Sequence, residues 1–536
     1  MARTQTSSSR LLNRRTFLAL SGLGAASLLT ACNPGGSAHS VNPSQTVTPT
    51  TLPTRVPTPT EADWSQLASS LHGTLVRPDS AKYTTARQLF NTRFDTILPA
   101  GIAYCAASAD VQTCLAFVRR FQIPVTARSG GHSYAGYSTS TGLIIDMTQM
   151  NQVSVDTGSG TATIDGGAHL VDVYSALTQH GLVIPAGSCP TVGISGLTLG
   201  GGVGVLGRKF GLTCDNLLSA QVVLANGQVQ TCDQQSNADL FWALQGGGGG
   251  NFGIVTSLTF QTHPVSALSL FTYNWPWSSA AAVVDAWQHW GPSAPDELWS
   301  NCLLLGSSDK QSEPVVRVNG VYVGQAAPLN VLLQQLTNAI GVAPTSSYVY
   351  TDPTLETMMV EAGCYGKSVA ECHLPSQNLQ GQLGRDTSQA KSDYVASLLP
   401  RPAIDALVNS INSRRSSQLL NNGGIGMDSY GGALNRVAAD ATAFVHRNAL
   451  FSIQYTASWN ASDSSSVVTA NTSWLNQIWR AMRSYVNGEA YQNYIDPDLA
   501  NWQQAYYGAN LARLQQVKAK YDPGNVFQFA QSIPLG

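Results

Sequence analysis

Residues 187–212 read GSCPTVGISGLTLGGGVGVLGRKFGL, and this stretch decides the fold. Its glycines recur every few positions, and a backbone without side chains can lie flat against a planar or phosphate-bearing ligand. Residues 202–207 match the GxGxxG pattern, but a Rossmann fold needs a preceding strand and an acidic residue roughly 20 positions further on. Here a cysteine-bearing loop precedes the glycines, and Asp215 follows Gly204 by only eleven positions. We therefore exclude a Rossmann fold and expect a ligand cradle of another kind.

Two further glycine clusters flank this stretch. Residues 128–133 read RSGGHS, where paired glycines let backbone N–H groups converge on an anion and the serines add hydroxyl donors. His132 lies inside this loop, and a glycine-rich turn with an incidental histidine is the alternative interpretation. Residues 246–256 read GGGGGNFGIVT and lead into an expected strand over 255–260.

The remaining pattern predicts an α+β protein of two large domains. Short strands and helices alternate between residues 100 and 146, with Asp110 expected to cap a helix. From residue 268 to 488, strands expected at 268–275, 315–323 and 450–459 alternate with helices at 281–290, 329–340 and 467–486. This pattern indicates an antiparallel sheet covered by helices. Tryptophans gather in the same region, where core packing is favoured over a sugar-stacking platform. They are Trp275, Trp277, Trp287, Trp290 and Trp299.

The N-terminus resembles an export signal. Arg14 and Arg15 precede an apolar run, which resembles a twin-arginine signal, and the run ends in Leu28-Leu29-Thr30-Ala31-Cys32, which resembles a lipoprotein lipobox. The run is shorter than the roughly 20 residues that span a bilayer. Residues 1–32 are therefore expected to be a signal and 33–60 a solvated Ser/Thr/Pro linker. We expect an exported protein, with membrane contact only through a lipid on Cys32.

Composition excludes some functions. Charged residues are 11% of the chain and the net charge is −2, so no basic excess favours nucleic acid as a partner. Nine cysteines are present, of which Cys364 and Cys372 are close enough in sequence to pair. Since no CxxC or His/Cys cluster has zinc spacing, we expect no metal.

The C-terminus adds YQNYID at 491–496 and YDPGNVF at 521–527. Together with the three glycine segments, these motifs resemble the FAD-binding module of vanillyl-alcohol-oxidase-type (PCMH-type) flavoproteins, in the berberine-bridge-enzyme subgroup. The resemblance implies a two-subdomain FAD-binding module over 61–265 and a substrate domain over 266–490. It also implies that residues 491–536 return to the FAD domain.

The resemblance further implies how FAD is held. In bicovalent members of this family, the histidine of the GGH loop bonds the flavin 8α-methyl group and the cysteine before PTVG bonds C6. His132 and Cys189 stand at these positions, and Val192 stands where a valine favours oxidase behaviour. The full set of residues expected to contact FAD is Arg128, Ser129, Gly130, Gly131, His132, Ser133, Gly136, Cys189, Val192, Gly193, Gly196, Gly200, Gly201, Gly202, Gly204, Gly253, Ile254, Val255 and Asn493.

Catalytic residues are expected on the substrate domain and in the C-terminal motif. Asp428 and Gln454 lie in expected strands, where alternate residues share a face, and sugar-oxidising relatives carry an aspartate and a glutamine at similar places. We assign Gln454 to substrate and Tyr491, assisted by Asp428, as general base, with Tyr494 as the competing base. Solvated strand residues and core tyrosines are the alternatives.

The implied activity is that of an FAD-dependent oxidase. A hydride would pass from an alcohol or sugar hemiacetal carbon to flavin N5, and O2 would become hydrogen peroxide. Gly424 and Gly426 stand where bulkier side chains would grip a sugar, so a strict oligosaccharide specificity is in doubt. A secondary-metabolite alcohol or amine as substrate, and a flavin-carrying binding protein with little turnover, are the alternatives.

Overall fold

The computed structural model describes residues 56–307, 312–416 and 423–536. The expected signal, 1–32, and almost all of the expected linker, 33–60, lie outside the described residues. The first described helix, α1 (Glu61–Ser70), begins with a capping box in which Thr60 and Asp63 satisfy each other's backbone N–H groups. Among the described residues, no helix has both the length and the hydropathy needed to cross a bilayer.

The N-terminal half is built on two sheets. The first has the order β1-β2-β4-β3, in which β2, β4 and β3 are parallel and β1 is antiparallel. The second is antiparallel, with the order β5-β6-β10-β8-β9. The bounds of these strands are β1 Thr74–Val76, β2 Gly101–Tyr104, β3 Val125–Arg128, β4 Leu143–Asp146, β5 Val153–Asp156, β6 Thr161–Asp165, β8 Leu217–Val223, β9 Val229–Asp233 and β10 Ile254–Gln261.

Helices and short loops connect these two sheets and carry the glycine clusters. Strands β7 and β11 form a small two-stranded antiparallel sheet just before the second half of the chain begins. The further bounds are α3 Ser108–Phe121, α4 Leu170–Thr178, β7 Leu182–Val183, α5 Ile194–Leu199, α6 Gly207–Phe210, α7 Ala238–Leu244 and β11 His263–Pro264.

The second half is one antiparallel sheet of seven strands in the order β15-β12-β14-β13-β17-β18-β16. Two of its strands, β12 and β14, have the bounds expected from sequence. The strands are β12 Leu268–Trp275, β13 Leu298–Leu305, β14 Val315–Val323, β15 Ser346–Asp352, β16 Ser388–Val395, β17 Gly423–Ser429 and β18 Phe451–Ser458. The longer helices are α8 Ala280–Trp290, α9 Ala326–Ile340, α10 Thr354–Glu361, α11 Arg401–Ser416 and α13 Ser465–Met482.

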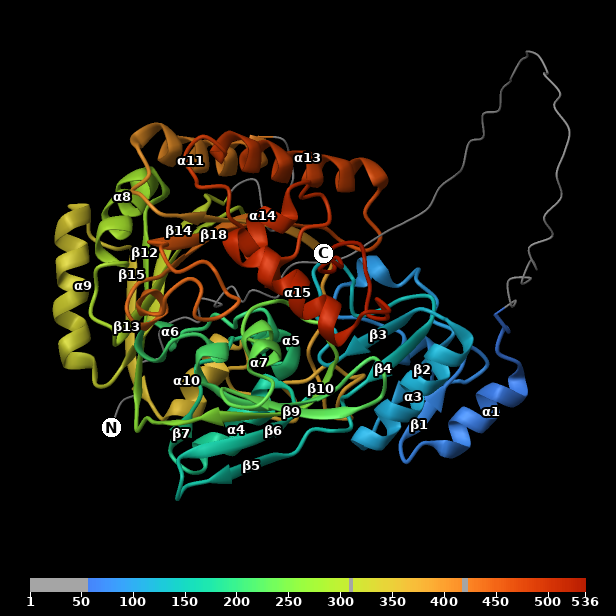
Figure 1. Ribbon diagram of the computed structural model, residues 1–536. Helices are drawn as coiled ribbons and strands as arrows, with labels where there is room; N and C mark the ends of the chain where they lie inside the picture. The colour runs from blue at the N-terminus through green and yellow to red at the C-terminus, as the bar shows by residue number, and fades with distance from the viewer. Residues whose placement is uncertain (1–55, 308–311, 417–422) are drawn as a thin grey trace, which may run out of the picture.

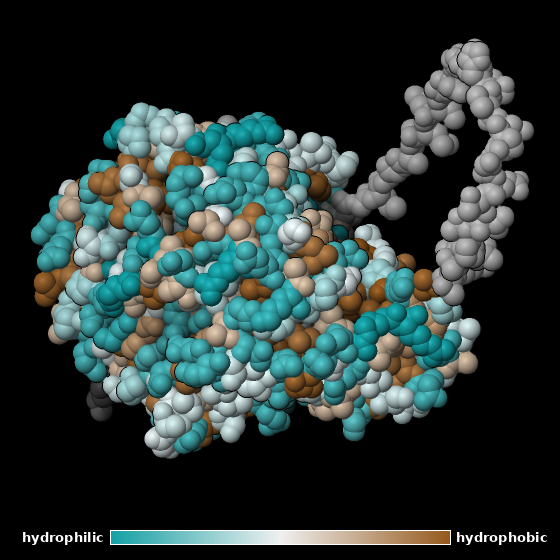
Figure 2. Space-filling model, viewed as in Figure 1, coloured by the Kyte–Doolittle hydropathy of each residue, from teal (hydrophilic) through white to brown (hydrophobic). Residues whose placement is uncertain are grey.

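The two faces of this sheet differ. Figure 1 shows α8, α9, α11 and α13 along its outer side, and side chains such as Phe271, Ile425 and Ile453 are fully buried in the core beneath helices. The alternate residues along the same strands are half-buried and mostly polar. On the molecular face in Figure 2, apolar residues are scattered among hydrophilic ones. The covered face therefore stabilises the sheet, and half-buried polar residues lie on the other face of β17 and β18.

Three local expectations can be compared with the structure. Cys364 and Cys372 form a disulfide. Most of the expected tryptophan cluster packs in the cores, for example Trp287, which is fully buried and donates its indole N–H to Ser300. The expected cap was wrong, because Ala107 is the N-cap of α3 and the Asp110 carboxylate instead accepts from the N–H groups of residues 72, 73 and 106.

The C-terminal segment packs back on the first half through α15 (Leu511–Tyr521), which lies against α7. Figure 1 shows α14 (Trp502–Tyr507) and α15 between the two halves. The Lys518 ammonium is fully buried and donates to the carbonyl oxygens of Asn251 at 2.8 Å and Phe527 at 2.6 Å, and to the buried Asp522 carboxylate at 2.7 Å. Lys518 thus joins the third glycine cluster to the end of the chain.

We expect Lys518→Ala to lower the free energy of unfolding by about 3–5 kcal/mol, because it leaves the Asp522 carboxylate buried without its cation. Lys520→Ala on the same helix is the matched control, since its pair with Asp239 is exposed and worth about 1 kcal/mol or less. Urea unfolding followed by circular dichroism measures both. Equal losses for the two variants would contradict the structural role of Lys518.

Candidate active site

The first two glycine clusters lie against each other. A Cβ added to Gly130 would lie 2.2 Å from the Gly193 nitrogen, and a Cβ on Gly193 would lie 1.9 Å from Ser129 Oγ. Ser129 in turn donates its hydroxyl to the Gly166 carbonyl at 2.8 Å. Only glycine permits this backbone approach, so the RSGGHS loop and the PTVG loop form one continuous surface.

His132 links the same two loops. Its Nε2 lies 2.8 Å from the Thr191 hydroxyl, and its ring stacks on Phe90 with centroids 4.1 Å apart. Burial, with a smaller contribution from His169, lowers the pKa of His132 to about 3. The imidazole is therefore neutral at physiological pH, and Nδ1 is the ring nitrogen that does not contact Thr191.

Cys189 lies two residues before Thr191, and its thiol is exposed. From there the chain enters α5, where a Cβ on Gly196 would meet no atom within 4 Å. The nearest heavy atom to a Cβ on Gly249, in the third cluster, would be the Gly196 Cα at 3.9 Å. Two glycine segments thus border open space next to an exposed thiol and a neutral imidazole. This arrangement fits a flat cofactor.

Other expected cofactor residues have structural contacts. The Arg128 guanidinium pairs with Asp146 and donates to the Ala86 carbonyl at 2.7 Å. Its buried Nη1 has no hydrogen-bond partner in the part of the chain that the structure describes, so this is the atom that a cofactor oxygen would satisfy. Ser133 Oγ accepts from the Tyr137 N–H at 2.9 Å, and Gly136, at φ +77°, packs on the Phe94 ring.

Asp428 and Gln454 share the open face of the seven-stranded sheet. Gly426 is the register partner of Gln454, and Asp428 lies two residues further along β17, so both side chains point to the same side. Both are half-buried. Gln454 Nε2 donates to the Tyr134 hydroxyl at 3.0 Å. The expected substrate residue therefore contacts the residue that directly follows the RSGGHS segment, two positions beyond His132.

Tyr134 was missed by the sequence reasoning, although it directly follows the RSGGHS motif. Its ring centroid lies 5.4 Å from that of Tyr494, which is half-buried and comes from the C-terminal motif. Tyr134, Gln454 and Tyr494 thus converge from three distant segments. This cluster lies beside the residue expected to tether the flavin.

Tyr491, the expected general base, has a different environment. Its hydroxyl oxygen accepts from the N–H groups of Gly202 at 3.0 Å and Val203 at 3.3 Å, and from Asn493 Nδ2 at 3.0 Å. Burial outweighs these hydrogen bonds and raises the pKa of Tyr491 to about 12. Three donors on its buried oxygen attach Tyr491 to the second glycine cluster, and burial makes the phenol hard to ionise. Tyr494, in contrast, is half-buried and lies against Tyr134.

Asn493 also attaches the C-terminal motif to the second glycine cluster. Its Nδ2 also donates to the Leu197 carbonyl at 2.9 Å, and a Cβ on Gly200 would lie 2.0 Å from its Oδ1. The C-terminal motif thus holds α5 and the glycines that follow it.

Two family models match the chain. Residues 99–233 match the FAD binding domain, and residues 490–534 match the berberine and berberine-like model. An uncharacterized FAD-linked oxidoreductase of Bacillus subtilis, YgaK, is 34% identical over 471 residues, which are 87% of this chain and 98% of that protein. The chain belongs to the family of berberine-bridge-enzyme-like FAD-linked oxidoreductases.

Solved structures of this family have the same architecture. The berberine-bridge-enzyme-like protein 1 of Physcomitrella patens aligns with a TM-score of 0.80 at 33% identity, covering 88% of this chain and 99% of that one. A chitooligosaccharide oxidase aligns with a TM-score of 0.76 at 28% identity, covering 88% of this chain and 99% of that one. The expected α+β fold with an FAD-binding module and a substrate domain is thus confirmed, and FAD is the cofactor of the cradle described above.

Proposed function

We propose that the protein is an oxidase of hydroxyl-bearing substrates, a sugar hemiacetal foremost, with FAD tethered to His132 and Cys189. The observation that carries the proposal is the convergence of Gln454, Tyr134 and Tyr494 beside His132. This convergence supports a substrate site with polar groups next to the flavin cradle.

The surroundings of the two tether residues support the covalent links. A covalent bond to imidazole needs a neutral ring, and the pKa of about 3 keeps His132 neutral. Thr191 fixes Nε2, which orients the ring. Cys189 is exposed in the same loop. Two tethers on adjoining loops would hold the ring system from one edge and leave a face open to substrate.

When bound, FAD would supply the redox chemistry, as the acceptor of a hydride from the substrate carbon and the source of the two electrons that reduce O2 to hydrogen peroxide. The residues of the chain handle the proton and the orientation. Tyr494 accepts the proton of the reacting hydroxyl, and Gln454 and Asp428 hold the substrate over the sheet. The overall change is CH–OH plus O2 to C=O plus hydrogen peroxide, which for a hemiacetal gives a lactone.

The polar face of the sheet supports a polyhydroxylated substrate. Asn301 is the register partner of Asp428 and is 1% exposed, yet its Oδ1 has no hydrogen-bond partner in the described ranges. A substrate hydroxyl would satisfy this oxygen, since buried polar atoms are rarely left unpaired. Further polar side chains continue the same face of the sheet, namely Thr272, Asn274, Asn319 and Thr456.

An anaerobic screen tests the proposal. We expect mono- and oligosaccharides with a free hemiacetal to bleach the flavin absorbance, and admission of air to restore it with one hydrogen peroxide per lactone. A panel of benzylic alcohols, secondary-metabolite alcohols and amines serves as the comparison. Bleaching by that panel alone would move the substrate class to those compounds, and no bleaching by any compound would favour a flavin-carrying binding protein.

We propose export for the same chain. The twin-arginine-like motif and the lipobox-like Cys32 support it, and so does the Cys364–Cys372 disulfide, because disulfides persist in oxidising compartments. Fractionation of cells with an antibody against the folded chain tests it, and cytosolic protein with an intact N-terminus would contradict it.

A further inference from the structure

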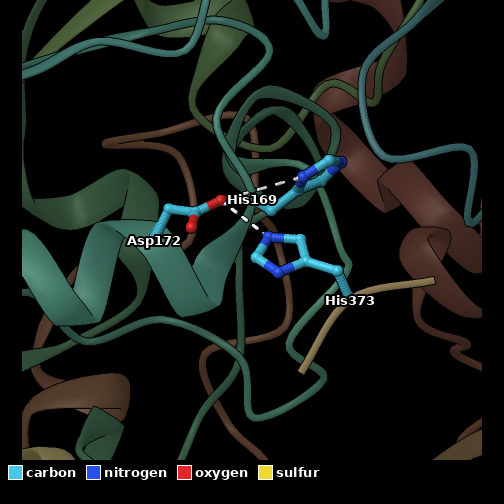
Figure 3. Close-up of side chains that lie close together, drawn as sticks. All are labelled: His169, Asp172 and His373. Atoms are coloured by element: carbon cyan, nitrogen blue, oxygen red, sulfur yellow. Dashed lines mark hydrogen bonds and ion pairs between the residues drawn. The ribbon is translucent and has the colours of Figure 1, made fainter. Parts of the chain in front are cut away.

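Three metal-type donors meet beside the flavin cradle, to which His169 is joined by a backbone bridge with Gly193. His169 is the N-cap of α4 and Asp172 lies in the first turn of that helix, while His373 directly follows Cys372 of the disulfide. The three side chains converge in Figure 3, with one nitrogen or oxygen of each within 4.8 Å of the others. Asp172 Oδ2 lies 2.9 Å from His373 Nε2 and 3.9 Å from His169 Nδ1.

The hydrogen bonds of His373 identify Nε2 as its ligand atom. Its Nδ1 lies 2.9 Å from the Val369 carbonyl oxygen, which can only accept, so Nδ1 carries a hydrogen. Its Nε2 faces the Asp172 carboxylate, which is also an acceptor. A hydrogen on Nδ1 leaves the Nε2 lone pair to bind a metal ion beside the Asp172 carboxylate.

We propose that His169, Asp172 and His373 bind one Zn²⁺ ion. Imidazole and carboxylate ligands suit zinc, and ligands at about 2.1 Å around a tetrahedral ion lie about 3.4 Å apart, a value between the two observed separations. The imidazoles are almost buried, while 37% of the Asp172 side chain is exposed, which gives the ion an entry path and room for a water ligand. The Val369 carbonyl orients His373, as partners of ligating histidines commonly do.

Gln377 limits the affinity of this site. Its Oε1 accepts from the Leu374 N–H at 3.2 Å, so its NH2 group faces His169 Nε2, also at 3.2 Å. An NH2 group can only donate, and this contact places the ring hydrogen of His169 on Nδ1, the atom that faces Asp172. Zinc binding therefore requires the Gln377 amide to turn and accept from Nε2–H, so that Nδ1 presents its lone pair to the ion.

The site would connect the two halves of the molecule. The Leu170 N–H donates to the Val192 carbonyl, and the Val171 N–H to the Pro190 carbonyl, each at 3.0 Å. His169 and its helix thus hold the loop that carries Cys189 and Thr191, while His373 belongs to the disulfide segment of the second half. The sequence expectation of no metal rested on local spacing, and His373 lies 201 positions from Asp172.

Zinc titration of the full chain tests the proposal. After chelator treatment and dialysis, calorimetry should show one Zn²⁺ per chain, and His373→Ala should lower the affinity about 100-fold. Asp172→Asn keeps a polar contact to His373 and removes the anionic ligand, so it should lose affinity while remaining folded by circular dichroism. His180→Ala, at an exposed histidine just after α4, is the control and should bind like wild type. No zinc binding by the wild-type chain, or equal binding by all four proteins, would overturn the proposal.

A gain-of-affinity variant tests the ligand set itself. In Gln377→Glu the carboxylate accepts from both the Leu374 N–H and His169 Nε2–H, so Nδ1 is left to bind the ion. We expect zinc affinity to rise about tenfold, the size of effect that partners of ligating histidines have. Gln380→Glu, exposed on the same segment, adds the same charge without this contact and should change affinity little. Equal affinities of these two variants would overturn the assignment of His169 Nδ1 as a ligand.

Discussion

Alanine at both His132 and Cys189 is expected to give a protein that loses all of its FAD on acid precipitation, whereas either single variant keeps its FAD in the pellet. A single covalent bond is enough to hold the flavin through unfolding, and a non-covalent cradle is not, because unfolding separates the RSGGHS and PTVG loops. The measurement is the flavin absorbance of pellet and supernatant after precipitation, together with flavin fluorescence of the protein band in a denaturing gel.

Cys302→Ala is the matched control for the thiol, because Cys302 is buried in the second half of the chain, away from both loops. This variant should retain flavin as the wild type does. Flavin in the supernatant from wild-type protein would contradict both links. Flavin in the pellet from the double variant would show that another residue is bonded.

The sequence predicted the type of most elements better than their arrangement. Strands β12 and β14 were bounded correctly, and in β14 buried and half-buried residues alternate over most of the strand. The strand order could not be predicted in this way. The pairing of β13 with β17 joins residues 301 and 428, and nothing in either segment encodes that partner.

In the candidate site too, some residues can be predicted from local motifs and others only from the fold. His132 and Cys189 stand out because glycines around them form readable motifs. Tyr134 could be recognised only from its contact with Gln454, which lies 320 positions away. The YxNY motif contains two tyrosines that the sequence alone cannot rank as candidate bases. Their burial distinguishes them: Tyr491 is buried behind the glycine loop, whereas Tyr494 is half-buried and faces Tyr134.

Tyr494→Phe is therefore expected to slow reduction of the flavin by substrate about 10²- to 10⁴-fold, the usual contribution of general base catalysis. The reason is that the reacting hydroxyl must lose its proton as the hydride leaves, and phenylalanine keeps the ring packing against Tyr134 while removing the acceptor. Anaerobic stopped-flow measurement of flavin absorbance gives this rate directly. Thermal unfolding should change little, because Tyr494 is only half-buried.

Tyr491→Phe is the matched comparison. We expect it to lower stability more, and the rate of flavin reduction less, than Tyr494→Phe does. It removes the oxygen that accepts from Gly202, Val203 and Asn493, leaving buried donors unpaired at about 1–3 kcal/mol of stability. Its reduction rate should fall less than that of Tyr494→Phe, because its phenol does not accept the substrate proton. A Tyr491→Phe variant that keeps wild-type stability and loses the reduction rate, next to a Tyr494→Phe variant with normal rates, would make Tyr491 the base. In that case the three hydrogen bonds to its oxygen would stabilise the phenolate.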